Sequence, residues 1–150
     1  MHASYPASVN RQVVALAVAS LLVTLPHSFE DFVAGVPGRF GLSVLAAGFL
    51  LACAYAVHVV GIVLAARGSV WGYAINLLVG IGWLLGAAID HLPEIVRSGP
   101  YRAGLPSKAF EVGIMAVATA LIVVSARALG ARQSVEGDVE HDSGGSDDRR

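Results

Sequence analysis

Long apolar runs separated by short polar segments are the main pattern of this chain. Residues 40–66 contain no Asp, Glu, Lys or Arg and a single histidine, and residues 68–89 contain none of these five residue types. Two further apolar runs cover residues 13–25 and 109–126, the second interrupted only by one glutamate. Because a helix of about 20 apolar residues crosses a bilayer, this pattern predicts four membrane-spanning helices.

The first run is too short to span a bilayer unless it continues into polar residues. Residues 13–25 reach only ~20 Å at a rise of about 1.5 Å per residue, so a full crossing extends through His27 and Glu30 to about residue 34. A secretory signal peptide is the alternative, since Arg11 precedes a short apolar stretch, but no small-x-small cleavage site directly follows the run. We therefore interpret it as a span, which places polar side chains inside the membrane boundary.

The composition supports an all-α integral membrane four-helix bundle. Hydrophobic residues make up 55% of the chain and charged residues 14%, and the mean hydropathy is +0.67. The apolar composition predicts that the lipid bilayer surrounds the protein. The formal net charge of −1 and the lack of a basic patch give no support to a nucleic-acid partner. The predicted parts are an N-terminal tail (1–11), a transmembrane domain (12–132) with spans near 12–35, 40–66, 69–91 and 108–129, and an acidic, Gly/Ser-rich tail (133–150) expected to be disordered.

Four spans place both termini on one membrane face. The loops near residues 35–39 and 91–107 lie on the opposite face, which we call face A. The positive-inside rule does not orient the chain, because four basic residues lie near the membrane on each face. We adopt a multi-pass cell-membrane protein with cytoplasmic termini as the working hypothesis, and leave open whether the chain forms a homo-oligomer.

Polar side chains share one side of the first predicted helix. At about 100° per residue, Ser20, Thr24, His27, Glu30 and Asp31 fall within roughly 120° of one another. Since the first and third helices run toward face A and the second and fourth run away from it, ionisable side chains of three helices should meet there. The predicted cluster comprises His27, Glu30, Asp31, Asp90, His91, Glu94 and Glu111.

Imidazole and carboxylate groups at one end of a helical bundle are typical of a site for a divalent transition metal such as Zn, Fe or Mn. His27 lies three residues before Glu30 and four before Asp31, a spacing that puts two ligands on one side of a helix. The simpler alternative is that these are hydrated side chains at the membrane interface. Ionisable residues inside a bilayer are costly and usually functional, which favours a site.

The other members of the cluster have structural alternatives. His91 and Glu94 are three residues apart, but Pro93 is predicted to end that helix and to leave Glu94 in a loop. Asp90 and His91 could instead close the third helix at the water boundary. Glu111 lies in the first turns of the fourth helix, where the helix dipole favours a carboxylate.

His58 and Asn76 form a separate pair of polar residues at similar predicted depth. His58 lies eight residues, and Asn76 six residues, from the turn that joins their helices. A hydrogen bond between the two side chains would satisfy both groups, and we predict it. The alternative is a role as a ligand or as a proton relay.

The sequence HSFEDFVAGVPGRF at residues 27–40 resembles the signature of the HXXEE family of small bacterial and archaeal membrane proteins, in which His-x-x-Glu-Glu is followed by an aromatic residue and a Gly-x-Pro turn. His27 and Glu30 match the first two signature positions, whereas Asp31 replaces the second Glu and is shorter by one methylene. The resemblance implies a multi-span helical architecture and supports this site. It implies no particular activity, because none is established for the family.

Two functions would use the charged residues directly, and the sequence does not decide whether the protein is an enzyme. In the first, His27 and a carboxylate bind a metal or act as a general acid and base on a lipophilic small molecule. In the second, a proton-coupled transporter uses side chains as stations across the membrane. Those stations would be Glu30, Asp31, Asp90 and His58.

Two further functions remain. A noncatalytic accessory or assembly subunit would use the glycine-rich third helix for contact with a partner, and then Gly82 and Gly86 would matter more than His27. Bis-histidine haem binding would use His27 and His91.

Overall fold

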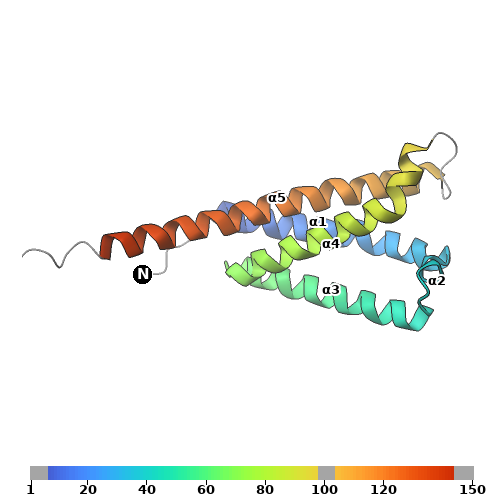
Figure 1. Cartoon of the computed structure of the whole chain (residues 1–150), viewed down its shortest axis with the longest axis horizontal. Coiled ribbons are helices and arrows are strands. Elements are labelled where there is room, and N and C mark those ends of the chain that lie inside the picture. The colour runs from blue at the N-terminus through green and yellow to red at the C-terminus, as the bar shows by residue number, and fades with distance from the viewer. Residues whose placement is uncertain (1–6, 98–103, 144–150) are drawn as a thin grey trace, which may run out of the picture.

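The computed structural model describes the backbone of residues 7–97 and 104–143, and the side chains of residues 8–97 and 104–131. Within these ranges the chain is all-α (Figure 1), with the helices α1 (Ala7–Val33), α2 (Val36–Arg39), α3 (Val44–Ala66), α4 (Val70–Val96) and α5 (Gly104–Ser143). Four segments of the described chain are long and apolar enough to cross a membrane: Ser8–Val33, Val44–Ala66, Val70–Val96 and Gly104–Ala131. The predicted multi-pass helical bundle is confirmed.

The end of α4 differs from the prediction. Pro93 lies inside the helix, which continues to Val96, so the expectation that this proline ends it is wrong. A proline removes only one helical hydrogen bond, and a membrane helix tolerates that loss where neighbouring groups support the backbone. The last turn of α4 has a separate cap, because Lys108 Nζ donates a hydrogen bond of 3.2 Å to the carbonyl oxygen of Ile95.

The outer ends of α1 and α5 also extend beyond the predicted spans. α1 begins at Ala7 rather than near residue 12, and α5 continues to Ser143. The first part of the tail expected to be disordered therefore has helical backbone. Three segments lie outside the described residues: 1–6 of the predicted N-terminal tail, 98–103 of the predicted face A loop and 144–150 of the C-terminal tail.

Two glycines provide the sharp turns at the ends of the first two spans. Gly35, with φ of 72°, separates α1 from α2, and Gly68, with φ of 71°, lies between α3 and α4. Residues with a side chain rarely adopt this left-handed conformation, so another residue would strain either turn. Ser43 caps the start of α3: its Oγ accepts a hydrogen bond of 3.1 Å from the backbone nitrogen of Ala46.

Buried residues follow an alternating four-and-three spacing along α1 and α5. This spacing gives each helix one inward stripe, as in bundles whose helices pack at shallow angles. Large apolar side chains such as Leu22, Leu45, Leu78 and Ile89 are exposed instead, as expected of a surface in contact with lipid. The inward stripes comprise Val13, Ala17, Ser20, Thr24 and His27 on α1 and Ser107, Glu111, Ile114, Ala118, Leu121, Ser125 and Ala128 on α5.

Small residues let α4 approach both of its main neighbours. A Cβ on Gly72 would overlap the backbone of Ala65 in α3, and a Cβ on Gly80 would lie 3.3 Å from the carbonyl oxygen of Ala118 in α5. α3 and α4 are therefore in close contact near the turn that joins them, and they diverge toward α2 (Figure 1). The diverging end is face A, where α1, α4 and α5 carry their ionisable residues.

Candidate metal centre

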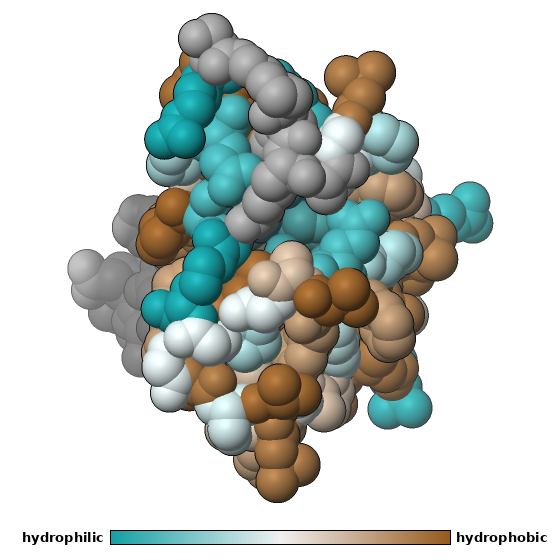
Figure 2. Space-filling model, turned by 90° about the vertical axis from the view of Figure 1, so that its right-hand side faces the viewer, coloured by the Kyte–Doolittle hydropathy of each residue, from teal (hydrophilic) through white to brown (hydrophobic). Residues whose placement is uncertain are grey.

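Face A gathers ionisable side chains from three of the long helices. Hydrophilic side chains cluster at this end of the molecule, and apolar ones surround them (Figure 2). His27 of α1, His91 of α4 and Glu111 of α5 are all buried, with 7%, 3% and 0% of their surface exposed. Because lipid surrounds a membrane bundle, charged groups held in this interior carry a large desolvation cost and need close partners.

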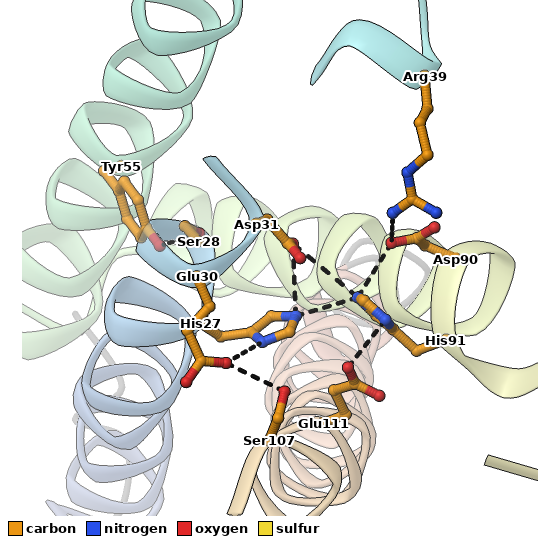
Figure 3. A network of polar contacts seen from close by, with 10 residues as sticks. All are labelled: His27, Ser28, Glu30, Asp31, Arg39, Tyr55, Asp90, His91, Ser107 and Glu111. Carbon is orange, nitrogen blue, oxygen red and sulfur yellow. Dashed lines mark hydrogen bonds and ion pairs between the residues drawn. The ribbon is translucent and has the colours of Figure 1, made fainter. Parts of the chain in front are cut away.

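Three of these side chains direct polar atoms at one point. His27 Nε2 and His91 Nε2 are 3.0 Å apart and within hydrogen-bond distance. Asp31 Oδ2 lies 3.4 Å from His27 Nε2 and 3.9 Å from His91 Nε2 (Figure 3). The predicted i, i+4 pairing on α1 therefore occurs, and α4 adds the second imidazole. We call His27, Asp31 and His91 the central triad.

A carboxylate lies beside the second ring nitrogen of each histidine. Glu111 Oε1 is 2.9 Å from His91 Nδ1, and both side chains are buried. Glu30 Oε2 is 3.7 Å from His27 Nδ1 and accepts a hydrogen bond of 3.1 Å from Ser107 Oγ (Figure 3). Glu111 is thus more than a residue placed to suit the helix dipole, because it contacts an imidazole of the central triad.

Asp90 and Arg39 form the outer side of the cluster. Arg39 Nη2 donates a hydrogen bond of 3.2 Å to Asp90 Oδ2, and the same oxygen lies 3.4 Å from His91 Nε2. The guanidinium group from α2 therefore offsets part of the negative charge that the carboxylates bring to face A. Sequence reasoning missed this contact; the available signal was an arginine two residues after the Gly-x-Pro turn.

A second polar contact lies next to His27 on α1. Ser28 Oγ and Tyr55 Oη are 3.0 Å apart and link α1 to α3. The Tyr55 ring also packs against Trp83 of α4, with ring centroids 5.4 Å apart. The sequence offered little indication of the contact between Ser28 and Tyr55, since neither residue is charged and Tyr55 lies within an apolar run.

The geometry of the central triad fits a tetrahedral metal ion. With bonds of about 2.0–2.1 Å, two nitrogen or oxygen ligands of tetrahedral zinc lie about 3.3 Å apart. The three observed separations, 3.0, 3.4 and 3.9 Å, lie around that value. Two imidazoles and one carboxylate are ligands that Zn, Fe and Mn accept. Three ligands also leave one position open, which is the arrangement of catalytic rather than structural zinc sites.

The remaining sequence candidates do not join the central triad. Glu94 lies in α4 and is half-buried, so its placement in a loop was wrong. The predicted hydrogen bond between His58 and Asn76 does not form. Asn76 Nδ2 donates to the carbonyl oxygen of Gly72 at 2.7 Å, and neither ring nitrogen of the fully buried His58 has a hydrogen-bond partner among the described residues.

Searches against protein-family models, curated proteins and solved structures find no match for this chain. Membership of the HXXEE family, suggested by residues 27–40, stays a prediction.

Proposed function

We propose that this protein binds a divalent transition metal through His27, Asp31 and His91 and acts there on a lipophilic small molecule. The observation that carries the proposal is the set of three separations within the central triad, which match the ligand spacing of a small tetrahedral ion. The four candidate spans support the lipophilic nature of the substrate, because the site lies at the end of a bundle surrounded by hydrocarbon.

The carboxylates outside the triad support the same proposal. Histidines that bind metals almost always direct their second ring nitrogen at a carboxylate, a carbonyl or water, which fixes the ring and makes the ligand more basic. His91 has Glu111 at 2.9 Å in this position, and His27 has Glu30 at 3.7 Å. His91 thus has a carboxylate in close contact with its second ring nitrogen, whereas Glu30 lies near His27 without forming a hydrogen bond to it.

The accessible carboxylate of the site is Glu30. Its side chain is 45% exposed, whereas that of His27 is 9% exposed. A metal ion bound here supplies Lewis-acid chemistry at its open position. Glu30 is then placed to exchange a proton with an incoming molecule while Ser107 holds it by a hydrogen bond of 3.1 Å.

A proton-transfer function is the second candidate, and one observation favours it. The Nε2 atoms of His27 and His91 are 3.0 Å apart, so one ring can donate a hydrogen bond directly to the other. The contact between His91 and Glu111 would extend this path toward α5. Bis-histidine haem ligation does not suit the pair, because axial ligands approach the iron from opposite sides of the macrocycle.

Elemental mass spectrometry of the detergent-purified protein tests the metal proposal. We expect about one zinc, iron or manganese ion per chain in the wild type and none in the His91→Ala variant. The matched control is His58→Ala, which removes another buried histidine, outside the cluster, and should retain the metal. Metal-free wild-type protein, even after incubation with each ion, would contradict the proposal and favour proton transfer.

The predicted location in the cell membrane with cytoplasmic termini belongs to this proposal as well. Exposed Cys53, the only cysteine of the chain, can be replaced by Ser, and single cysteines can then be placed at each membrane face. Labelling of whole cells with a membrane-impermeant maleimide should modify a cysteine at Arg39 of face A and spare one at Arg67. The opposite labelling pattern would reverse the orientation.

A further inference from the structure

An apolar cavity of about 670 Å³ lies between α3 and α4 on the face A side of their contact. Its lining includes Leu51, Cys53 and Val57 of α3, Gly82 and Trp83 of α4, and Phe32 of α1. Several lining residues of both helices, such as Cys53 and Gly82, are exposed, so the cavity opens to the lipid-facing surface of the bundle. Its contents are therefore drawn from the hydrocarbon of the bilayer.

A second apolar cavity of about 430 Å³ lies between α1 and α3. Phe32 and Leu51 line both cavities, so these two side chains form the wall between them. Phe32 is half-buried and directly follows Asp31 of the central triad in the chain. We call the two adjoining spaces, which share Phe32 and Leu51 in their linings, the slot; it extends from the α3–α4 surface to α1.

Polar groups lie between these cavities and the central triad. Ser28 lines the second cavity, directly follows His27 in the chain, and contacts the hydroxyl of Tyr55 at 3.0 Å. The Tyr55 ring packs on Trp83, which lines the first cavity. A ligand with a hydrocarbon chain in the slot would thus find hydrogen-bonding groups at the end nearest His27.

We propose that the slot holds a single hydrocarbon chain of an amphiphilic membrane lipid, with the polar group of that lipid beside Ser28 and Tyr55. The combination of an apolar lining with a few polar groups at one end is the usual form of a small-molecule site, and each volume lies in the range of about 300–1,000 Å³ of such sites. The inference rests on the proposed function only for contact between the polar group of the lipid and the central triad. Binding of the hydrocarbon chain in the slot does not require a metal.

A helix from a second copy of the protein is a poorer occupant. With side chains a helix is about 10–12 Å across, so the larger cavity would hold only about one turn of it. A hydrocarbon chain is narrow enough to enter the slot lengthwise from the bilayer. Filling by a lipid chain also restores the contacts that an empty cavity would deny to its lining.

The two tryptophans provide a direct test. Trp83 lines the cavity, whereas Trp71 is 70% exposed near the opposite end of α4. Trp71→Phe leaves Trp83 as the only tryptophan, and Trp83→Phe leaves Trp71. A fatty acid brominated in mid-chain, which quenches tryptophan on contact, is added to each variant in bilayer nanodiscs. We expect the quenching of Trp71 to rise linearly with the fatty-acid fraction, and that of Trp83 to saturate and to reach a given extent at a fraction about tenfold lower than for Trp71.

Gly82 and Gly86 offer matched variants that separate a bound chain from general contact with lipid. A Cβ at either position meets no atom within 4 Å, so both glycines accept a side chain without a backbone clash, but only Gly82 lines the cavity. In the Trp71→Phe background, Gly82→Leu should abolish the saturable quenching and Gly86→Leu should retain it. Quenching of Trp83 that rises linearly like that of Trp71, or that persists in Gly82→Leu, would overturn the proposal.

The same variants distinguish failure of this inference from failure of the metal proposal. Gly82→Leu should retain the metal content of the wild type, and His91→Ala should retain saturable quenching of Trp83. Linear quenching of Trp83 together with a normal metal content would refute only the lipid proposal. Saturable quenching in a wild type that binds no metal would refute only the metal proposal.

Discussion

Replacement of Glu111 should weaken metal binding although Glu111 is not one of the three proposed ligands. Glu111 Oε1 lies 2.9 Å from His91 Nδ1, and their side chains are 1% and 3% exposed. In Glu111→Gln a polar amide can still lie beside the imidazole, but the carboxylate that can pair with it is lost. In Glu111→Ala the second ring nitrogen of His91 is left without this partner.

The size of the effect follows from the burial of the pair. If metal binding draws the imidazole and the carboxylate into a charge-assisted hydrogen bond, that bond contributes about 1.5–3 kcal/mol, and water does not replace it at a site this buried. That energy corresponds to about 10–150-fold in affinity, close to the 10–100-fold typical of carboxylates that orient metal-binding histidines. We expect about tenfold weaker binding for Glu111→Gln, which keeps a neutral polar group beside the imidazole, and about 100-fold for Glu111→Ala.

Competition between the protein and a chromophoric chelator for zinc measures these affinities. Glu94→Gln is the matched control, because Glu94 is half-buried at the same end of the bundle and lies outside the central triad. Its affinity should equal that of the wild type. Wild-type affinity in both Glu111 variants, or an equal loss in Glu94→Gln, would refute the idea that Glu111 acts through His91.

Three predictions concern stability, measured by unfolding in mixed SDS and mild detergent. Gly72→Ala should lower the free energy of unfolding by more than about 2 kcal/mol because its Cβ overlaps the backbone of α3, whereas Gly82→Ala has open space and should not lower it. An equal effect of both would contradict the packing. His58→Leu should raise the free energy of unfolding by about 1–3 kcal/mol, since it removes a buried imidazole without a hydrogen-bond partner among the described residues. A lower free energy of unfolding would instead show that His58 makes a stabilising interaction. Tyr73→Phe removes the hydrogen bond to Asn10 and should cost about 1 kcal/mol, with no change in metal content.

Contacts within one helix were predictable, because the helical period alone determines them. His27 and Asp31 are four residues apart and necessarily lie on one side of α1, and their polar atoms are 3.4 Å apart. The number of spans was equally accessible, since the apolar runs are long and almost free of charge. Neither conclusion requires knowledge of how the helices are rotated about their axes.

Contacts between helices were harder to predict, because depth in the membrane does not determine rotation. His58 and Asn76 were paired by depth, yet the Asn76 amide bonds to Gly72 one turn earlier in its own helix, an alternative that is always within reach of Asn. Glu111 was predicted to lie near face A, with the helix dipole as the alternative reason for its position. Its position in the four-and-three stripe with Ile114 and Ala118 was the available signal that it faces inward.

α1 and α4 run in the same direction, and polar contacts join them near both ends. Tyr73 donates to Asn10 at the face of the termini, and His27 meets His91 at face A. Each of the two helices packs more extensively against α3 and α5 than against the other. An ion shared by the two histidines would therefore connect two long spans that pack only slightly against each other. In the protein without metal, α5 and α3 would still hold the bundle together, and the contact between α1 and α4 at face A should be the first to loosen.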